Sequence, residues 1–213
     1  MDKVQEYLLS LVKQDDALLQ EMEQFAAEHG VPIMDKLGME FMLQLLRLIQ
    51  PKAILEVGAA IGYSAICMVK ATDARVVTIE RDEERYNKAV FYIERANLTN
   101  SISLLFGDAL ETGEQVQAYG KFDVIFIDAA KGQYQRFFEM YEPLLTDNGV
   151  ILTDNVLFRG LVAEETIENK RMRSLVKKIK SYNEWLMAHP GYHTTIFPIG
   201  DGVAVSKKRG EHK

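Results

Sequence analysis

The sequence predicts an α/β fold in which a seven-stranded, mostly parallel sheet has an antiparallel last strand and helices on both faces. From residue 52 onward, short β-rich runs alternate with amphipathic segments of helical length. Several runs are apolar without alternation, as expected for parallel strands covered on both faces. The last two runs are separated only by Gly200-Asp201-Gly202, which permits a hairpin but no parallel crossover. The last strand should therefore run against the others.

The predicted strands follow from these runs, and they occupy residues 53–57, 75–79, 102–106, 122–127, 150–153, 193–199 and 203–207. The segments between them predict helices at 83–97, 133–145 and 165–188.

Three more helices are predicted before the first strand. The first two carry apolar residues at helical spacing, and His29-Gly30 should end the second. The third, at 38–49, is apolar almost all round and should be buried. Together they form a helical cap at 1–50 on a core at 51–213.

Length and composition set limits on the class of protein. A chain of 213 residues, 47% hydrophobic, suits one domain over residues 1–213. Its net charge of −6 argues against a protein that coats nucleic acid with a generally basic surface. A single cysteine, Cys67, cannot form an internal disulfide, and no run reaches the ~20 apolar residues of a membrane span. We expect a cytoplasmic protein that makes no membrane contact.

The segment after the first predicted strand indicates a ligand site. Gly58 and Gly62 lie in the spacing G-x-x-x-G, and small residues let the backbone turn and approach a ligand. The G-x-G-x-x-G of a pyrophosphate loop is absent, so a neutral nucleoside with an amino-acid tail fits better. A tight turn without a ligand is the alternative for this glycine pair alone.

Acidic residues end the next two strands. Glu80 is well placed to accept hydrogen bonds from both ribose hydroxyls, and Asp108 from an adenine amino group. Either acid alone is equally typical of a helix cap. Three such loops on consecutive strands favour a nucleoside site, since ligands of these sheets bind at the carboxyl ends of the strands.

Oxygen-bearing side chains follow the fourth and fifth strands. Asp128, Asp154 and Asn155 are hard ligands that suit Mg²⁺, with Mn²⁺ or Ca²⁺ as alternatives. The Asp-Asn pair alone would be read as a cap. Together with Asp128 and Lys131 it favours a metal site.

These motifs resemble those of the cation-dependent O-methyltransferases related to catechol O-methyltransferase, which have the class I methyltransferase (Rossmann-like) fold. The resemblance covers nearly the whole chain. Within that family, the stretches at 31–34, 128–134 and 154–162 resemble the bacterial tRNA 5-hydroxyuridine methyltransferases.

The resemblance implies a role for each motif. Lys131 matches the general base, and Mg²⁺ would be held by Asp128, Asp154 and Asn155. S-adenosylmethionine would have its ribose on Glu80, its adenine on Asp108, and its methionine tail beside Gly58, Tyr63 and Ser64. The full predicted cofactor set is Ile33, Glu56, Gly58, Tyr63, Ser64, Glu80, Asp108, Ala109 and Asp128.

The acceptor is predicted from weaker signals. Residues 170–180 hold six cations and no acid, and a face that can meet phosphates is formed by Lys170, Arg173, Lys177 and Lys180, with Arg159 nearby. A solvated helix face is the ordinary alternative. Ala130 stands where the animal catechol enzyme has a bulky aromatic residue, which suggests a more open entrance.

We therefore expect a tRNA substrate, methylated at wobble 5-hydroxyuridine, and a homodimer as is common in the resembling family. A small-molecule catechol or caffeoyl-type enzyme is the alternative. A dinucleotide-dependent oxidoreductase is disfavoured by the missing central glycine and the reversed last strand. A non-catalytic RNA-binding module is the remaining alternative.

Overall fold

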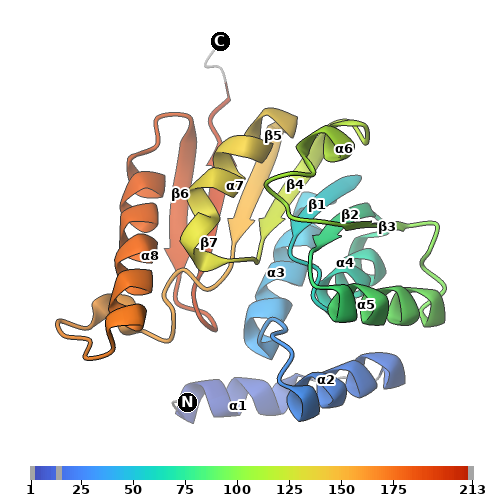
Figure 1. The fold of residues 1–213 in the computed structure, drawn as a ribbon, viewed down its shortest axis with the longest axis horizontal. Coiled ribbons are helices and arrows are strands. Elements are labelled where there is room, and N and C mark those ends of the chain that lie inside the picture. The colour runs from blue at the N-terminus through green and yellow to red at the C-terminus, as the bar shows by residue number, and fades with distance from the viewer. Residues whose placement is uncertain (1–2, 13–15, 211–213) are drawn as a thin grey trace.

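A computed structural model describes residues 3–12 and 16–210 (Figure 1). Within these residues, seven strands form one sheet in the spatial order β3-β2-β1-β4-β5-β7-β6. Neighbouring strands are parallel except at β7, which runs antiparallel to β5 and β6. The predicted fold class is confirmed. The strands are β1 (Ala53–Val57), β2 (Arg75–Glu80), β3 (Ile102–Phe106), β4 (Phe122–Ile127), β5 (Leu145–Thr153), β6 (Tyr192–Phe197) and β7 (Val203–Lys208).

Helices cover both faces of the sheet. Alternate residues of each central strand point to opposite sides, so Ile54 and Phe126 join one core cluster while Leu55 and Ile125 join the other. The first cluster is completed by α2 (Ala17–His29), α3 (Lys36–Ile49), α4 (Tyr63–Thr72) and α5 (Glu83–Arg95). The second is completed by α6 (Gly113–Gln117), α7 (Tyr134–Tyr141) and α8 (Lys170–Ala188).

Two helix predictions need correction. The helix expected at 133–145 is α7 between the 3₁₀ turns η1 (Lys131–Gln133) and η2 (Glu142–Leu144), where Pro143 cannot donate a helical hydrogen bond. The helix expected at 165–188 begins only at Lys170, because the Asn169 side chain accepts from the Met172 amide and caps it there. Strand β5 is longer than predicted and begins at Leu145.

The N-terminal helices lie across the end of the sheet at which the parallel strands finish (Figure 1). Gly30 adopts a φ of 65° and ends α2 as predicted. The apolar side of α1 (Lys3–Leu11) is exposed rather than packed, with Val4 and Tyr7 more than 60% accessible. Along the described residues, no helix is long and apolar enough to cross a membrane.

Helix α3 is not buried all round, contrary to the prediction. Leu46 is fully buried in the core, whereas Leu48 is 73% exposed. The two leucines differ because residues two positions apart point to different sides of a helix. The helix therefore packs through one side only.

The same helix offers a matched test of packing. Leu46→Ala should lower the free energy of unfolding by about 2–5 kcal/mol, since it leaves a cavity in the core. Leu48→Ala should change it by less than ~0.5 kcal/mol, because the side chain is already in water. Urea unfolding followed by circular dichroism measures both. Equal losses would show that Leu48 is covered in solution.

Candidate active site

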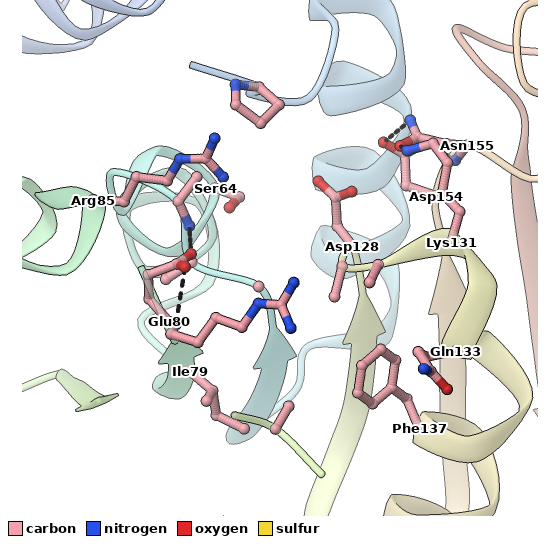
Figure 2. Close-up of a pocket in the computed structure, with 18 of the residues that line it drawn as sticks. Ser64, Ile79, Glu80, Arg85, Asp128, Lys131, Gln133, Phe137, Asp154 and Asn155 are labelled. Carbon is pink, nitrogen blue, oxygen red and sulfur yellow. Dashed lines mark hydrogen bonds between the residues drawn. The ribbon is translucent and has the colours of Figure 1, made fainter. Parts of the chain in front are cut away.

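A cavity of about 350 Å³ opens where β1 to β5 end. Figure 2 shows Ser64 and Glu80 on one side of it and Asp128, Asp154 and Asn155 on the other. The structure thus brings together residues from five strand ends, the usual ligand position of such sheets. With one exception, the predicted cofactor, metal and catalytic residues line the cavity: Ile33, Gly58, Tyr63, Ser64, Glu80, Asp108, Ala109, Asp128, Lys131, Asp154 and Asn155.

Gly58 lets the loop after β1 lie against the end of β4. A Cβ there would overlap the carbonyl oxygen of Asp128 and lie 2.9 Å from its carbonyl carbon. Its φ of +107° is also one that side-chain-bearing residues rarely adopt. The Asp128 amide donates to the Val57 carbonyl at 3.0 Å. Gly58 was predicted to let the backbone approach a ligand. In the structure it lets the backbone of the loop approach the backbone of Asp128.

Glu80 organises the nucleoside end of the cavity. Its carboxylate accepts from the backbone amides of Ala60 at 2.8 Å, Arg81 at 2.9 Å and Asp82 at 2.9 Å. A carboxylate offers roughly four lone-pair positions, so about one remains for a ligand. The structure thus gives Glu80 a part in shaping the loops as well as an open acceptor position.

The loop after β3 is held from two sides. Asp108 accepts from the Leu110 amide at 2.9 Å and from Arg81 at 3.2 Å. The amide hydrogen bond, and then Arg81, hold the pKa of Asp108 below its usual value. The Tyr141 hydroxyl donates to the Ala109 carbonyl at 2.5 Å. This loop is therefore fixed before any ligand binds.

Glu56 is the predicted cofactor residue that does not line the cavity. It is fully buried, and its two oxygens accept from the hydroxyls of Ser64 and of Thr78, the latter at 2.5 Å. Burial raises the pKa of Glu56 to about 7, although both hydroxyl bonds oppose the shift. Glu56 therefore lies behind the cavity wall, and its part in cofactor binding stays a prediction. Because the Ser64 hydroxyl donates its hydrogen bond to Glu56, its lone pairs are left to accept from a ligand.

The cap closes the cavity near this wall. Ile33 lies between α2 and α3, with Pro32 and Met34 beside it in the cavity lining. Tyr63 is buried, and its hydroxyl donates to Glu23 of α2 at 2.7 Å. The N-terminal helices are therefore tied directly to the cavity.

The opposite end of the cavity holds two carboxylates, of which Asp154 is fully buried and Asp128 half-buried. Burial raises the pKa of Asp128 to about 6, while Lys131 opposes the shift. The pKa of Asp154 is raised well above its usual value, first by burial and then by the charge of Asp128. Two neighbouring carboxylates with raised pKa values favour either a proton or a bound cation.

Lys131 and Asn155 complete this end. Lys131 donates to the side-chain oxygen of Asn155, whose own amide groups donate to Asp154 at 2.7 and 2.9 Å. Among the described residues, no group of three or more His, Cys, Asp or Glu side chains is placed to hold a metal. The predicted ligands Asp128, Asp154 and Asn155 do not form such a group, because the third of them supplies an amide oxygen. Their two carboxylates and amide fit a hard divalent cation.

Sequence reasoning missed several residues that line the cavity. Arg81 lines the cavity and donates to Asp108. Figure 2 shows Arg85 on the same side as Glu80, and Gln133 and Phe137 below Asp128. Arg81 follows Glu80 directly, which was a usable signal. Phe137 belongs to α7 and is almost fully buried, so it also packs in the core.

The predicted RNA-contact residues are exposed, and none lines the cavity: Arg159, Lys170, Arg173, Lys177 and Lys180. Helix α8 begins at the same end of the molecule as the cavity (Figure 1). In the described part of the chain, no ion pair involves a cation of this helix. Its first three turns therefore present uncompensated positive charge.

The model of the O-methyltransferase family matches residues 10–209. This chain belongs to that family. A catechol O-methyltransferase of Niastella koreensis is 31% identical over 216 residues, covering 96% of both chains. Caffeoyl-CoA O-methyltransferase 1 of Arabidopsis thaliana is 27% identical over 221 residues, covering 97% of this chain and 85% of the plant enzyme.

Solved structures of the O-methyltransferase family agree with this fold. A Staphylococcus aureus protein, provisionally named a caffeoyl-CoA O-methyltransferase, is 39% identical with a TM-score of 0.92, covering 98% of this chain and 100% of that one. The Bacillus cereus O-methyltransferase in complex with SAH is 29% identical with a TM-score of 0.82, covering 97% of each chain. The predicted class I O-methyltransferase is confirmed, whereas closeness to the tRNA enzymes stays a prediction.

Alanine substitutions at two glycines with positive φ distinguish the effect of steric overlap on stability from that of backbone strain. Gly58→Ala should lower stability more than Gly160→Ala, because a Cβ at Gly160 has nothing within 4 Å. Both variants should lose about 1–2 kcal/mol from the left-handed backbone, and only Gly58→Ala must also displace Asp128. Urea unfolding of the two proteins measures the difference. Equal losses would contradict the close packing of β1 against Asp128.

Proposed function

We propose that this O-methyltransferase moves the methyl group of S-adenosylmethionine to a hydroxyl held beside Asp128, Asp154 and Asn155 by a divalent cation, with Mg²⁺ the favoured ion. The observation that carries the proposal is the cluster of two carboxylates, Asp128 and Asp154, with Asn155 and Lys131 at one end of the cavity, where Lys131 donates to Asn155. The other end, at Glu80 and Asp108, suits a nucleoside.

The cofactor assignment is supported by the polarity of the cavity wall. Glu80 and Asp108 present acceptors, as ribose hydroxyls and an adenine amino group require. Ser64 donates its hydroxyl hydrogen bond to Glu56, so its lone pairs can accept from an α-ammonium group. The complex of the Bacillus cereus relative with SAH agrees with this cofactor class.

The chain's own residues have defined parts in the transfer. When bound, Mg²⁺ supplies a Lewis acid that lowers the pKa of a coordinated hydroxyl. Lys131 lies at the same end of the cavity and, in its neutral amine form, would take the hydroxyl proton and become an ammonium. The methyl transfer is an in-line displacement, so the walls mainly position donor and acceptor.

For the acceptor we propose 5-hydroxyuridine at the wobble position of tRNA. Its O4 and 5-hydroxyl are neighbouring oxygens that can chelate one cation, as the two oxygens of a catechol can. The exposed cations at the start of α8 favour a polyanion. A catechol or caffeoyl-type acceptor is the second candidate, favoured by the names of the Niastella koreensis and Arabidopsis thaliana relatives.

Removing a carboxylate tests the metal. Asp154→Ala should abolish turnover and weaken Mn²⁺ binding at least ~10-fold in titration calorimetry, because one of three oxygen ligands is lost. Circular dichroism should show an intact fold, and Asp147→Ala, at an exposed position, serves as the control. If protein freed of metal by EDTA methylates as fast as the magnesium form, the proposed mechanism is wrong.

Charge reversal on α8 tests the acceptor. The pair Lys177→Glu and Lys180→Glu should lower kcat/KM for hydroxyuridine-containing tRNA roughly 10- to 100-fold, since phosphate contacts are lost. Catechol methylation should not change. The exposed lysines Lys52 and Lys121, reversed in the same way, are the matched control for net charge. Transfer of the label from S-adenosylmethionine to each acceptor is measured. If the wild-type protein labels catechol well but leaves the tRNA unlabelled, the RNA acceptor is rejected.

A further inference from the structure

Helix α8 is tied to the cation end of the cavity by buried tyrosines. The hydroxyl of Tyr182 shares a hydrogen bond of 2.9 Å with the hydroxyl of Thr153, the last residue of β5. The Tyr182 ring also packs on the Tyr134 ring, with the centroids 5.3 Å apart. Tyr134 in turn donates to the Asp154 carbonyl at 2.9 Å. The position of α8 relative to the cation end is therefore fixed.

Lys178 lies on the side of α8 that faces this end of the cavity, one turn before Tyr182. A Cβ at Gly132 would lie 3.4 Å from both the δ-carbon and the ammonium nitrogen of Lys178. Gly132 stands in η1 between Lys131 and Gln133, and both of these neighbours line the cavity. The Lys178 ammonium therefore lies at the rim of the cavity, beside the turn that carries Lys131.

The charge of Lys178 is open to a ligand. The side chain is exposed, and within the described residues no acid forms an ion pair with it. Lys177 and Lys180 come five and two residues before Tyr182, so a period of 3.6 residues per turn points them away from η1. Those two lysines suit phosphates farther along an RNA, whereas Lys178 is the one beside the cavity.

We propose that Lys178 binds a phosphate group adjoining the nucleotide that is methylated. The proposal rests on the proposed function, in which the 5-hydroxyl of a uridine reaches Lys131 at the cation end. A base that is modified in this way leaves its stack, while its sugar and phosphates stay outside the pocket. An ammonium at the rim, without an acidic partner, is suited to charge-assisted hydrogen bonds with phosphate oxygens. Lys178 thus favours nucleotide acceptors over uncharged catechols.

An RNA stem-loop that carries 5-hydroxyuridine tests the contact when single phosphates are neutralised. A methylphosphonate replaces the phosphate on the 5′ or on the 3′ side of the target, and transfer of label from S-adenosylmethionine is measured. Wild-type protein should lose roughly 10-fold in kcat/KM for one of these two RNAs, because one charge-assisted hydrogen bond disappears. Lys178→Gln should lose roughly 10-fold on the unmodified RNA and nothing further on that methylphosphonate RNA. Lys178→Arg, which keeps the charge, should retain most of the activity.

The matched control is Lys52→Gln, because Lys52 is exposed and precedes β1, at the end of the sheet opposite the cavity. It should keep the full sensitivity to the methylphosphonate.

The outcomes separate the inference from the proposed function. The Lys178 contact is overturned if wild-type protein methylates both methylphosphonate RNAs as well as the unmodified one, or if the losses multiply in Lys178→Gln. An equal fall in catechol methylation by Lys178→Gln would show a role in packing η1 instead. Wild-type protein that labels catechol but no RNA would overturn the proposed acceptor together with the inference, and protein that labels neither would overturn the proposed function.

Discussion

The contact between Gly58 and the backbone of Asp128 is the constraint on which the site depends. It lets the end of β1 lie against the end of β4, where the Asp128 amide donates to Val57. The loop after β1 forms one wall of the cavity, and Asp128 begins the end that holds Asp154 and Asn155. Because the contact joins the loop after β1 to the end of β4, it fixes the distance between the two ends of the cavity.

Three acids lie at or near this contact: Glu56 and Asp154 are fully buried, and Asp128 is half-buried. Glu56 has a hydroxyl on each oxygen, from Ser64 and Thr78, and acts on the cavity only by orienting Ser64. Burial raises the pKa of both Asp128 and Asp154, the charge of Asp128 raises that of Asp154 further, and Lys131 opposes both shifts. Burial thus has two different results. At Glu56 it is offset by hydrogen bonds that orient Ser64, whereas at Asp128 and Asp154 it favours a nearby positive charge.

The reversed strand β7 contributes to the site as well as to the sheet. It pairs with β5, and the turn before it receives the amides of the loop that follows β5. Asn155 and Phe158 can hold left-handed conformations because Asp201 and Gly202 brace that loop. A topological feature of the fold thus fixes the side chains nearest Lys131.

Reading the residues in order was enough to predict the sheet, its reversed strand and the end at which the site lies. Those features depend on local patterns: apolar runs, short connections and polar residues at strand ends. Packing decided the rest, because it depends on residues far apart in the chain. It placed Glu56 behind the wall, exposed Leu48, and brought Phe158 to Lys131 through a hairpin over 40 residues downstream of that loop.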